Sequence, residues 1–305
     1  MLAGTAGYGF LAYIEDDSAF LWISFAFRIL QGFGDGCAST AIYSIIAIEF
    51  KEEKALYLSY FSAATGLGAL LGPMIGQLIF NQVGFASTFF VLAGMIGLAF
   101  ILQFISVPNR VNKTKGPIKK FEGAKKITFL NFLTNKRALM ACISTTTGLI
   151  LLLFYLTIYS DYMINDVKVD KKYIGFLFGI QPGTFFVMAP IVGYFSKRVP
   201  RIYIAQLAFF TIPISVSLYG PSKFLGIPQK LYIMLPGNVC MGISNSLMLV
   251  PLIAEIIDAV KQKEKVDEED EATTSKISDL ASGLYGSCNA LGSFTAPIVG
   301  GLLNE

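Results

Sequence analysis

Several stretches of about 20 residues in this 305-residue chain are apolar and almost free of charge. A helix of about 20 apolar residues spans the roughly 30 Å of hydrocarbon in a bilayer. In hydrocarbon every backbone N–H and C=O must find a partner inside the protein, so spanning segments form helices or a closed barrel. Barrel strands alternate apolar and polar residues, whereas these stretches are unbroken. The sequence therefore predicts an all-α membrane protein.

The composition excludes several other classes of protein. Hydrophobic residues make up 54% of the chain and charged residues only 15%, against about 25% charged in a soluble domain. The absence of histidine removes the commonest metal ligand and general base. The net charge of +3 comes without a basic, aromatic face for nucleic acid. We therefore expect the lipid bilayer as a partner, with no nucleic acid, no metal, no cofactor and no catalytic residues.

Nine segments are long and apolar enough to be candidate spans, although the first is short. They run approximately over Met1 to Ile14, Phe20 to Ile48, Leu56 to Phe80, Ser87 to Val107, Ala138 to Ser160, Tyr173 to Phe195, Ile202 to Gly220, Leu231 to Ile257 and Leu280 to Leu303.

The basic residues between these spans indicate an orientation. If successive loops alternate sides, one side receives 18 of the 24 Lys and Arg residues. Short loops rich in Lys and Arg stay in the cytoplasm, so this side is predicted to be cytoplasmic. It includes a basic linker, residues 108–137, and a second charge run from Lys261 to Lys276. A solvated loop is the simplest interpretation of both, with contact to anionic lipid headgroups as an alternative for the linker.

A glycine-proline motif occurs twice. Gly68-Ala-Leu-Leu-Gly72-Pro73-Met-Ile-Gly76 in the third span matches Gly292-Ser-Phe-Thr-Ala-Pro297-Ile-Val-Gly300-Gly301 in the ninth. Glycines four residues apart let a neighbouring backbone approach, and the proline bends the helix. The copies lie six spans apart, so both cross in the same direction. We predict a parallel repeat whose helices pack at a moving interface, with static helix packing as the alternative.

The repeat also predicts the organisation of the chain. Residues 1–107 would form one transmembrane half and residues 138–305 the other, joined by the linker 108–137. Counting spans from each copy of the motif leaves the first half without two initial helices and the second half without a final one. The expected design therefore has twelve helices in two pseudo-symmetric halves, of which this sequence holds about nine.

These motifs resemble those of the major facilitator superfamily, whose two six-helix halves are related by an axis along the membrane normal. Arg28-Ile-Leu-Gln31-Gly-Phe-Gly34 resembles the R-x-x-Q-G-x-G signature of its fourth helix. The stretch from Gly68 to Gly76 is similar to the signature of its fifth helix, which the family associates with proton antiport. Two positions depart from the family pattern: Gln77 replaces a glycine, and Ser196 replaces an aspartate in the loop before the ninth family helix.

Within the superfamily the chain is most similar to the vesicular amine transporter branch, which includes polyamine transporter-like members. The likeness rests on residues 28–37, on Phe90-Val-Leu-Ala93 and on Pro251-Leu-Ile-Ala-Glu-Ile-Ile-Asp258. Where monoamine carriers place carboxylates, this chain has the residues Leu153, Ser246 and Gly286. A buried ammonium group needs a partner, so these departures argue against a monoamine as the solute.

Two charged residues lie inside the second span, where a charge costs at least about 2.5 kcal/mol at the centre of the bilayer. Arg28 and Asp35 are seven residues apart, so they share one face of a helix about 10 Å apart, with Gln31 between them. We expect Arg28 to control protonation of a nearby carboxylate. Asp35 is predicted to be that proton site or to contact a cationic solute. A structural ion pair is the alternative.

Other polar residues mark a possible gate or cavity. Glu255 and Asp258 lie three residues apart near the cytoplasmic end of the eighth span, where they could form a gate or simply reach the interface by snorkelling. Polar side chains within the spans could line a cavity, although such groups often only join helices. The candidates for a cavity are Tyr155, Tyr159, Asn245, Tyr285 and Asn289.

The resemblance implies a secondary transporter, not an enzyme. We expect proton-coupled antiport of a small organic cation or amine by alternating access, in a monomer. The expected location is the plasma membrane or an intracellular vesicle or vacuole. The alternative is a non-transporting membrane scaffold or an inactive transporter fragment, which the missing helices motivate.

Overall fold

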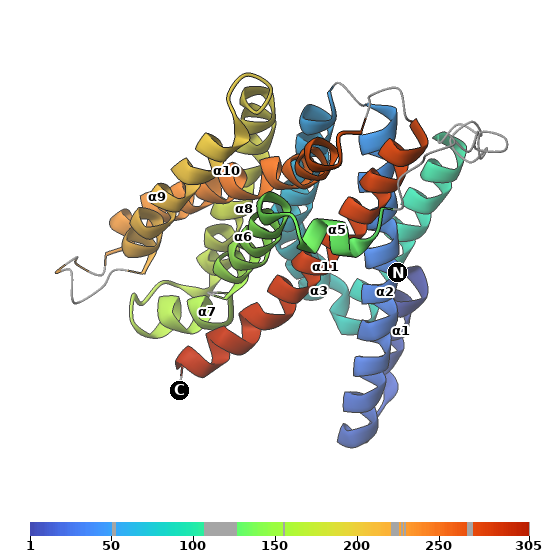
Figure 1. Cartoon of the computed structure of the whole chain (residues 1–305). Coiled ribbons are helices and arrows are strands. Elements are labelled where there is room, and N and C mark those ends of the chain that lie inside the picture. The colour runs from blue at the N-terminus through green and yellow to red at the C-terminus, as the bar shows by residue number, and fades with distance from the viewer. Residues whose placement is uncertain are drawn as a thin grey trace. The chain divides into compact units, whose positions relative to one another are not determined.

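The structure, a computed structural model, describes residues 1–50, 53–106, 127–154, 156–220, 226, 228, 230–266 and 271–304. Within them every regular element is a helix (Figure 1). The predicted all-α class is therefore confirmed. The chain divides into two compact units, and their border inside α3 follows Pro73. The first unit holds Met1–Ile45 and the part of α3 from Met74, and the second holds Ile46–Pro73 and the described residues from 127 onward.

The first unit is built on α1, α2 and the second part of α3. The bounds of these elements are Leu2–Phe10 for α1, Leu11–Tyr13 for the 3₁₀-helix η1, Asp17–Glu49 for α2 and Lys54–Ser106 for α3. The backbone of α3 leaves helical geometry at Gly84, which has a φ of 78°. Glycine adopts this conformation without steric cost. The break falls between the third and fourth predicted spans, so α3 contains both of them.

Glycines let α1 lie close to its neighbours in the first unit. A Cβ at Gly4 would lie 3.0 Å from the carbonyl oxygen of Phe27, and a Cβ at Gly9 would lie 2.8 Å from the ring of Phe90. The ring of Tyr8 stacks on Phe89, with 5.2 Å between centroids. The short first span is therefore packed between α2 and the second part of α3.

The second unit contains the remaining helices. Their bounds are Phe129–Leu133 for α5, Lys136–Leu153 for α6, Leu156–Asn165 for α7, Lys171–Phe195 for α8, Arg201–Tyr219 for α9, Leu231–Glu264 for α10 and Glu271–Asn304 for α11. The predicted span from Ala138 to Ser160 thus corresponds to α6 and part of α7.

Helix α10 is the core of the second unit. It contacts α6, α8, α9 and α11, and 78% of its most apolar stretch is buried, against 28% in α8 and α9. Glycines allow these contacts: a Cβ at Gly242 would lie 2.6 Å from the carbonyl oxygen of Gln181. Polar groups carried by α10 therefore lie between helices.

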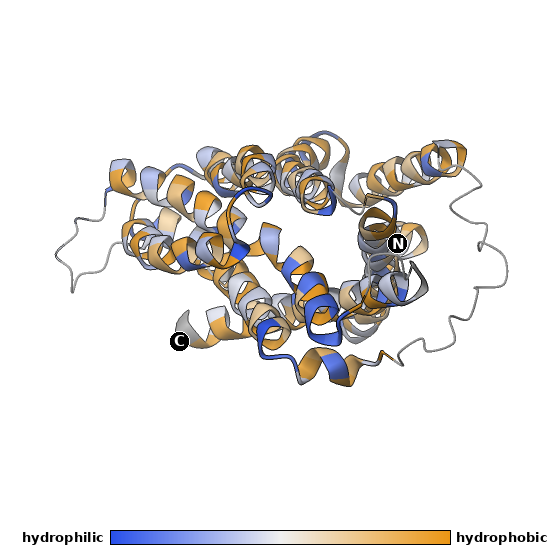
Figure 2. Ribbon diagram, turned by 45° about the horizontal axis from the view of Figure 1, so that its top comes forward, coloured by the Kyte–Doolittle hydropathy of each residue, from blue (hydrophilic) through white to orange (hydrophobic). Residues whose placement is uncertain are grey.

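Five of the described helices are long and apolar enough to cross a membrane by these criteria alone: α3, α6, α8 from Tyr173, α9 and α10. Large apolar side chains on the helices remain uncovered, including Phe104 at 81%, Phe210 at 75% and Phe294 at 71% exposure. Figure 2 shows hydrophobic residues along the lengths of the helices. Exposing such a side chain to water costs about 1.5–3 kcal/mol, so lipid is the solvent that suits this surface. The protein is a multi-pass membrane protein.

A close backbone approach between α9 and α10 provides a test of this packing. A Cβ at Gly237 would lie 2.5 Å from the backbone nitrogen of Tyr219. Because backbone cannot move aside as a flexible side chain can, we expect Gly237→Ala to destabilise the fold by about 1–3 kcal/mol. The melting temperature of the purified protein in detergent measures the effect.

The matched control for this change is Gly175→Ala in α8, where no described atom lies within 4 Å of a Cβ. Alanine is favoured over glycine in a helix by about 1 kcal/mol, so the control should be neutral or stabilising. Equal melting temperatures for Gly237→Ala and the unmodified chain would contradict the described packing of α9 on α10.

Candidate functional site

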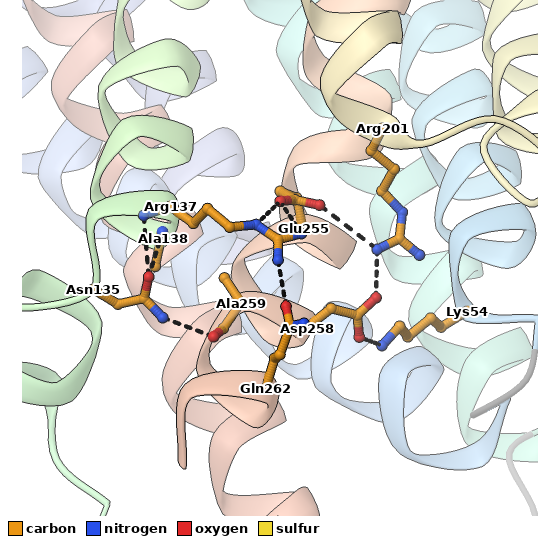
Figure 3. Close-up of polar contacts among 9 residues, drawn as sticks. All are labelled: Lys54, Asn135, Arg137, Ala138, Arg201, Glu255, Asp258, Ala259 and Gln262. Carbon is orange, nitrogen blue, oxygen red and sulfur yellow. Dashed lines mark hydrogen bonds and ion pairs between the residues drawn. The ribbon is translucent and has the colours of Figure 1, made fainter. Parts of the chain in front are cut away.

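Two carboxylates and three basic side chains form an ion-pair cluster in the second unit (Figure 3). Glu255 and Asp258 are three residues apart and share one face of α10. Lys54 and Arg201 are the first residues of α3 and α9, and Arg137 is the second residue of α6. We call these five residues the α10 cluster. It joins four helices at one end of α10.

Asp258 binds two cations. The Nζ of Lys54 donates to its Oδ1, and the Nη1 of Arg201 donates to its Oδ2. The same Arg201 nitrogen lies 3.9 Å from Oε2 of Glu255, so Arg201 bridges the two carboxylates. The side chains of Lys54 and Arg201 are only 11% and 18% exposed. Sheltered charges are poorly screened by salt, and removing a partner would leave them unpaired.

Glu255 binds the third cation. The Nη2 and Nε atoms of Arg137 lie 2.6 Å and 2.7 Å from Oε1 of Glu255. The Nη1 of Arg137 donates to Oε1 of Gln262 at 2.5 Å. Arg137 is 52% exposed, whereas Glu255 is 14% exposed. This part of the α10 cluster is therefore open to solvent on the arginine side.

Asn135 positions Arg137. Its Oδ1 accepts hydrogen bonds from the backbone N–H groups of Arg137 at 3.0 Å and Ala138 at 3.4 Å, which caps α6. Its Nδ2 donates to the carbonyl oxygen of Ala259 at 2.7 Å. The residue that caps α6 thus also binds α10, as Figure 3 shows.

The charges of the α10 cluster offset an unfavourable local arrangement. A cation in the first turn of a helix lies at the positive end of the helix dipole, which costs about 0.3–1 kcal/mol. Lys54, Arg137 and Arg201 all occupy such positions. Two carboxylates from α10 supply the opposite charge, so the acidic face of α10 stabilises the starts of α3, α6 and α9.

The α10 cluster also bears on the predicted topology. The starts of α3, α6 and α9 and the end of α10 were all expected on the cytoplasmic side, and in the second unit these four ends meet. Lys197, which follows α8, lies 2.5 Å from Glu53, which precedes α3. The contacts agree with the alternation of the loops. The positive-inside rule assigns this end to the cytoplasm.

In the first unit, Arg28 takes part in a polar chain with α1. Its Nη1 donates to Oε1 of Gln31 at 3.1 Å, and the Nε2 of Gln31 donates to Oγ1 of Thr5 at 3.2 Å. The guanidinium carbon lies 5.0 Å from the centroid of the Tyr8 ring, within the range of a cation–π interaction. Arg28 and Gln31 therefore contact each other on one face of α2, in agreement with their spacing.

Asp35 lies one helical turn beyond Gln31 and is exposed within the described chain. No ion pair or hydrogen bond joins its carboxylate to Arg28 among the described residues. Its backbone carbonyl accepts a hydrogen bond from Ser39 at 2.8 Å. A structural ion pair that locks helices, the alternative for these two residues, is not tested by this contact. The predicted roles of Arg28 and Asp35 in transport remain predictions.

Two buried amides lack hydrogen-bond partners among the described residues. Gln181 in α8 is 1% exposed and Asn245 in α10 is 0% exposed. Neither the oxygen nor the nitrogen of either side chain makes a hydrogen bond within the described chain. An unsatisfied buried amide costs about 1–3 kcal/mol, so such a group calls for a water or a ligand. Asn245 was predicted as a cavity residue, whereas Gln181 was not singled out.

The remaining candidates for a cavity are placed differently. Tyr159 is buried against Tyr219 and accepts a hydrogen bond from Nδ2 of Asn238 at 3.1 Å. Tyr285 is buried and its hydroxyl donates to the carbonyl oxygen of Leu249 at 3.3 Å, while the Oδ1 of Asn289 has no partner among the described residues. Tyr155 lies outside the described residues. Tyr159 and Tyr285 thus join helices, and their place in a cavity stays a prediction.

The two copies of the glycine-proline motif have different surroundings. A Cβ at Gly292 would lie 2.7 Å from Cβ of Leu149 and 2.8 Å from the carbonyl oxygen of Thr146, so α11 packs closely on α6 there. Gly300 is buried, and both prolines lie within their helices. Four other motif glycines have no described atom of their own unit within 4 Å of a Cβ: Gly68, Gly72, Gly76 and Gly301.

Sequence reasoning overlooked part of the α10 cluster. Lys54, Arg137 and Arg201 contributed only to the count of cytoplasmic charges. A usable signal existed, because three helices begin with basic residues and a fourth ends on the same side with two carboxylates. Among the described residues no group of three or more Asp, Glu or Cys side chains is arranged to hold a metal ion.

Comparison with known protein families adds an independent finding. The family description of the Major Facilitator Superfamily matches residues 1–268, which is most of the chain. The chain belongs to the Major Facilitator Superfamily. The superfamily and the vesicular amine transporter-like branch expected from the motifs are confirmed.

Relatives within the Major Facilitator Superfamily are distant in sequence but match between 77% and 98% of the chain. The MFS-type transporter SLC18B1 of Homo sapiens is 25% identical over 302 residues, which are 98% of this chain and 62% of the relative. The multi-drug resistance efflux pump PmrA homolog of Lactococcus lactis is 22% identical over 92% of this chain and 64% of the relative. The multidrug resistance protein MdtG of Yersinia enterocolitica is 25% identical over 77% and 56%. The chain thus spans less than two thirds of the length of these relatives.

Proposed function

We propose that this chain is a secondary active transporter that exchanges protons for a small organic cation or amine by alternating access. The observation that carries the proposal is the α10 cluster, because its ion pairs join four helix ends of the second unit, which is the arrangement we propose as a cytoplasmic gate. Family membership supports transport as the general activity. Protons, the class of solute and the gate itself are the parts that need experiments.

The α10 cluster has the properties that a gate requires. Its contacts are ionic and lie at helix ends, so they can separate without disturbing the apolar core of α10. The exposed side of Arg137 gives water a route to the pair with Glu255 as the helix ends part. Ion pairs that break and re-form offer two discrete arrangements of comparable free energy. Snorkelling alone would not require cations from three separate helices.

Gln181 and Asn245 are the groups that we assign to the solute. Gln181 is ten residues from the start of α8 and Asn245 is fourteen from the start of α10, which places them about 15 Å and 21 Å along their helices. These depths fall within a hydrocarbon layer of about 30 Å, and secondary transporters bind their substrates inside that layer, near its midplane. Amide oxygens accept hydrogen bonds from an ammonium group without adding a charge.

Uptake measurements test the proposal. The chain is reconstituted into vesicles and assayed with amines, polyamines and other organic cations, with and without an acidic interior. We expect a solute to accumulate when the interior is acidic, and a protonophore to abolish the accumulation. Uptake independent of the gradient would reject proton coupling. Failure of the correctly inserted protein to move any of these solutes would favour the non-transporting scaffold.

Variants of the two amides sharpen the same assay. Gln181→Leu and Asn245→Leu remove hydrogen bonds to a charged group, which are worth about 1.5–3 kcal/mol each, so KM should rise about tenfold or more. Asn81→Leu is the matched control, because Asn81 is an exposed amide of the first unit. Unchanged KM values in both α8 and α10 variants would remove these residues from the solute site.

A further inference from the structure

Two cysteines from different helices of the second unit lie against each other. Cys142 in α6 and Cys288 in α11 are both free thiols, and their side chains lie close enough to interact electrostatically. They are 146 positions apart in the sequence, so only the packing of α6 on α11 brings them together. Neither residue belongs to the α10 cluster or to the amides assigned to the solute.

The packing around the thiols is close and regular. Thr146, one turn after Cys142, donates a hydrogen bond from Oγ1 to the carbonyl oxygen of Cys288 at 3.3 Å. One turn after Cys288, a Cβ at Gly292 would lie 2.8 Å from the carbonyl oxygen of Thr146. The two helices are therefore in contact over successive turns. A disulfide needs Cα atoms about 4.4–6.8 Å apart, which requires an approach as close as this.

The two sulfurs differ in a way that suits stepwise oxidation. Cys142 is buried, whereas Cys288 is partly exposed. Cys288 is thus the sulfur that an oxidant reaches, and Cys142 is in place to react with the product. An accessible cysteine beside a second, resolving cysteine is typical of a redox-sensitive pair.

We propose that Cys142 and Cys288 form an oxidisable dithiol that a peroxide converts into a disulfide fixing α6 to α11. The Cys288 thiolate attacks one oxygen of the peroxide, the O–O bond breaks, and Cys288 becomes a sulfenic acid with release of water or an alcohol. The Cys142 thiol then displaces the hydroxyl group as water, forming the S–S bond. Two electrons pass from the sulfurs to the peroxide, and the thiol protons leave in the released products.

A disulfide at this position would restrict the second unit. Helix α6 ends at Leu153 and α7 begins at Leu156. The predicted span that contains Cys142 is therefore divided into two helices about two turns beyond Thr146. Both α6 and α7 contact α11. A covalent bond between α6 and α11 would hold the cytoplasmic part of this divided segment in one position. Oxidation is therefore expected to stabilise one conformation and to be reversible by a thiol reductant.

The test is made on the full chain in membranes, in a background that carries Cys37→Ser and Cys240→Ser. Membranes are treated with hydrogen peroxide, free thiols are alkylated, and peptides are analysed by mass spectrometry without reduction. We expect a disulfide-linked pair of peptides containing Cys142 and Cys288, its loss on reduction, and a higher melting temperature of the oxidised protein. This readout does not depend on transport, so it stays decisive if the proposed function fails.

A control variant moves one thiol without changing the number of cysteines. Ser287→Cys combined with Cys288→Ser turns the thiol by about 100° around α11, away from Cys142. The linked peptides should disappear in this variant while its melting temperature before oxidation stays close to that of the background. Alkylation of both Cys142 and Cys288 after peroxide treatment, or equal cross-linking in the moved-thiol variant, would overturn the proposal.

Discussion

Replacing Asp35 by asparagine is expected to abolish proton-driven accumulation of solute. Within the described chain the carboxylate pairs with no cation, because Arg28 instead contacts Gln31 and the ring of Tyr8. Replacing Asp35 therefore breaks no ion pair of the described chain, so the expected effect comes from the loss of the acidic group itself. Asparagine has nearly the same shape but cannot release a proton. Solute exchange across vesicles without a pH gradient should persist, because it requires no net proton movement.

The control for this change is Glu15→Gln, which removes a carboxylate from the exposed segment before α2. Its uptake should match that of the unmodified chain. Arg28→Lys keeps the charge but not the planar guanidinium that reaches Gln31 and Tyr8, so it should reduce uptake without abolishing it. Full proton-driven activity in both Asp35→Asn and Arg28→Ala would end the proposed role of this group.

Asp258→Asn is expected to give the second large effect. The change leaves Lys54 without its carboxylate and leaves Arg201 only the more distant Glu255. Breaking a buried ion pair costs about 3–5 kcal/mol. Asp258 is 35% exposed, so we expect the closed conformation of the gate to be destabilised by a smaller amount, about 1–3 kcal/mol. An equilibrium constant changes tenfold for each 1.4 kcal/mol, so the ratio of closed to open gate should fall about tenfold or more. Initial rates of uptake should fall accordingly.

A double-mutant cycle separates a gate from a set of independent charges. Lys54→Met removes the partner of Asp258, so the combination of Lys54→Met with Asp258→Asn should harm uptake less than the sum of the single changes. Asp166→Asn, at an exposed position after α7, is the control for loss of an aspartate. Snorkelling predicts instead that Asp258→Asn transports normally and shows no coupling with Lys54.

The existence of most helices could be predicted from the sequence, because lipid demands long apolar segments. The helices differ from the predicted spans at their ends, which local contacts determine. Helix α6 ends at Leu153, within a segment whose hydropathy is continuous. Helix α10 continues to Glu264, past the predicted end at Ile257, because its last turns carry contacts to α5 and α6. Hydropathy indicates whether a segment lies in lipid or in water, but it does not predict such side-chain contacts.

Part of the candidate site could also be predicted from the sequence. The spacing of Glu255 and Asp258 placed both on one face of a helix, and the spacing of Arg28 and Gln31 did the same. The partners of the carboxylates could not be predicted, because Lys54 and Asp258 are 204 positions apart in the chain. Gln181 was overlooked for a related reason, since only the tertiary structure shows that an amide lacks partners.

Asn135 restricts which substitutions the start of α6 can accept. Aspartate, serine and threonine all accept hydrogen bonds from the first N–H groups of a helix. Ionised aspartate has no hydrogen to offer the carbonyl of Ala259, and the shorter hydroxyl side chains cannot reach both helices at once. Loss of the cap bonds would therefore fray α6, and loss of the bond to Ala259 would loosen the attachment of α6 to α10. In a survey of natural variants, this small, uncharged side chain should tolerate fewer replacements than the charged residues around it.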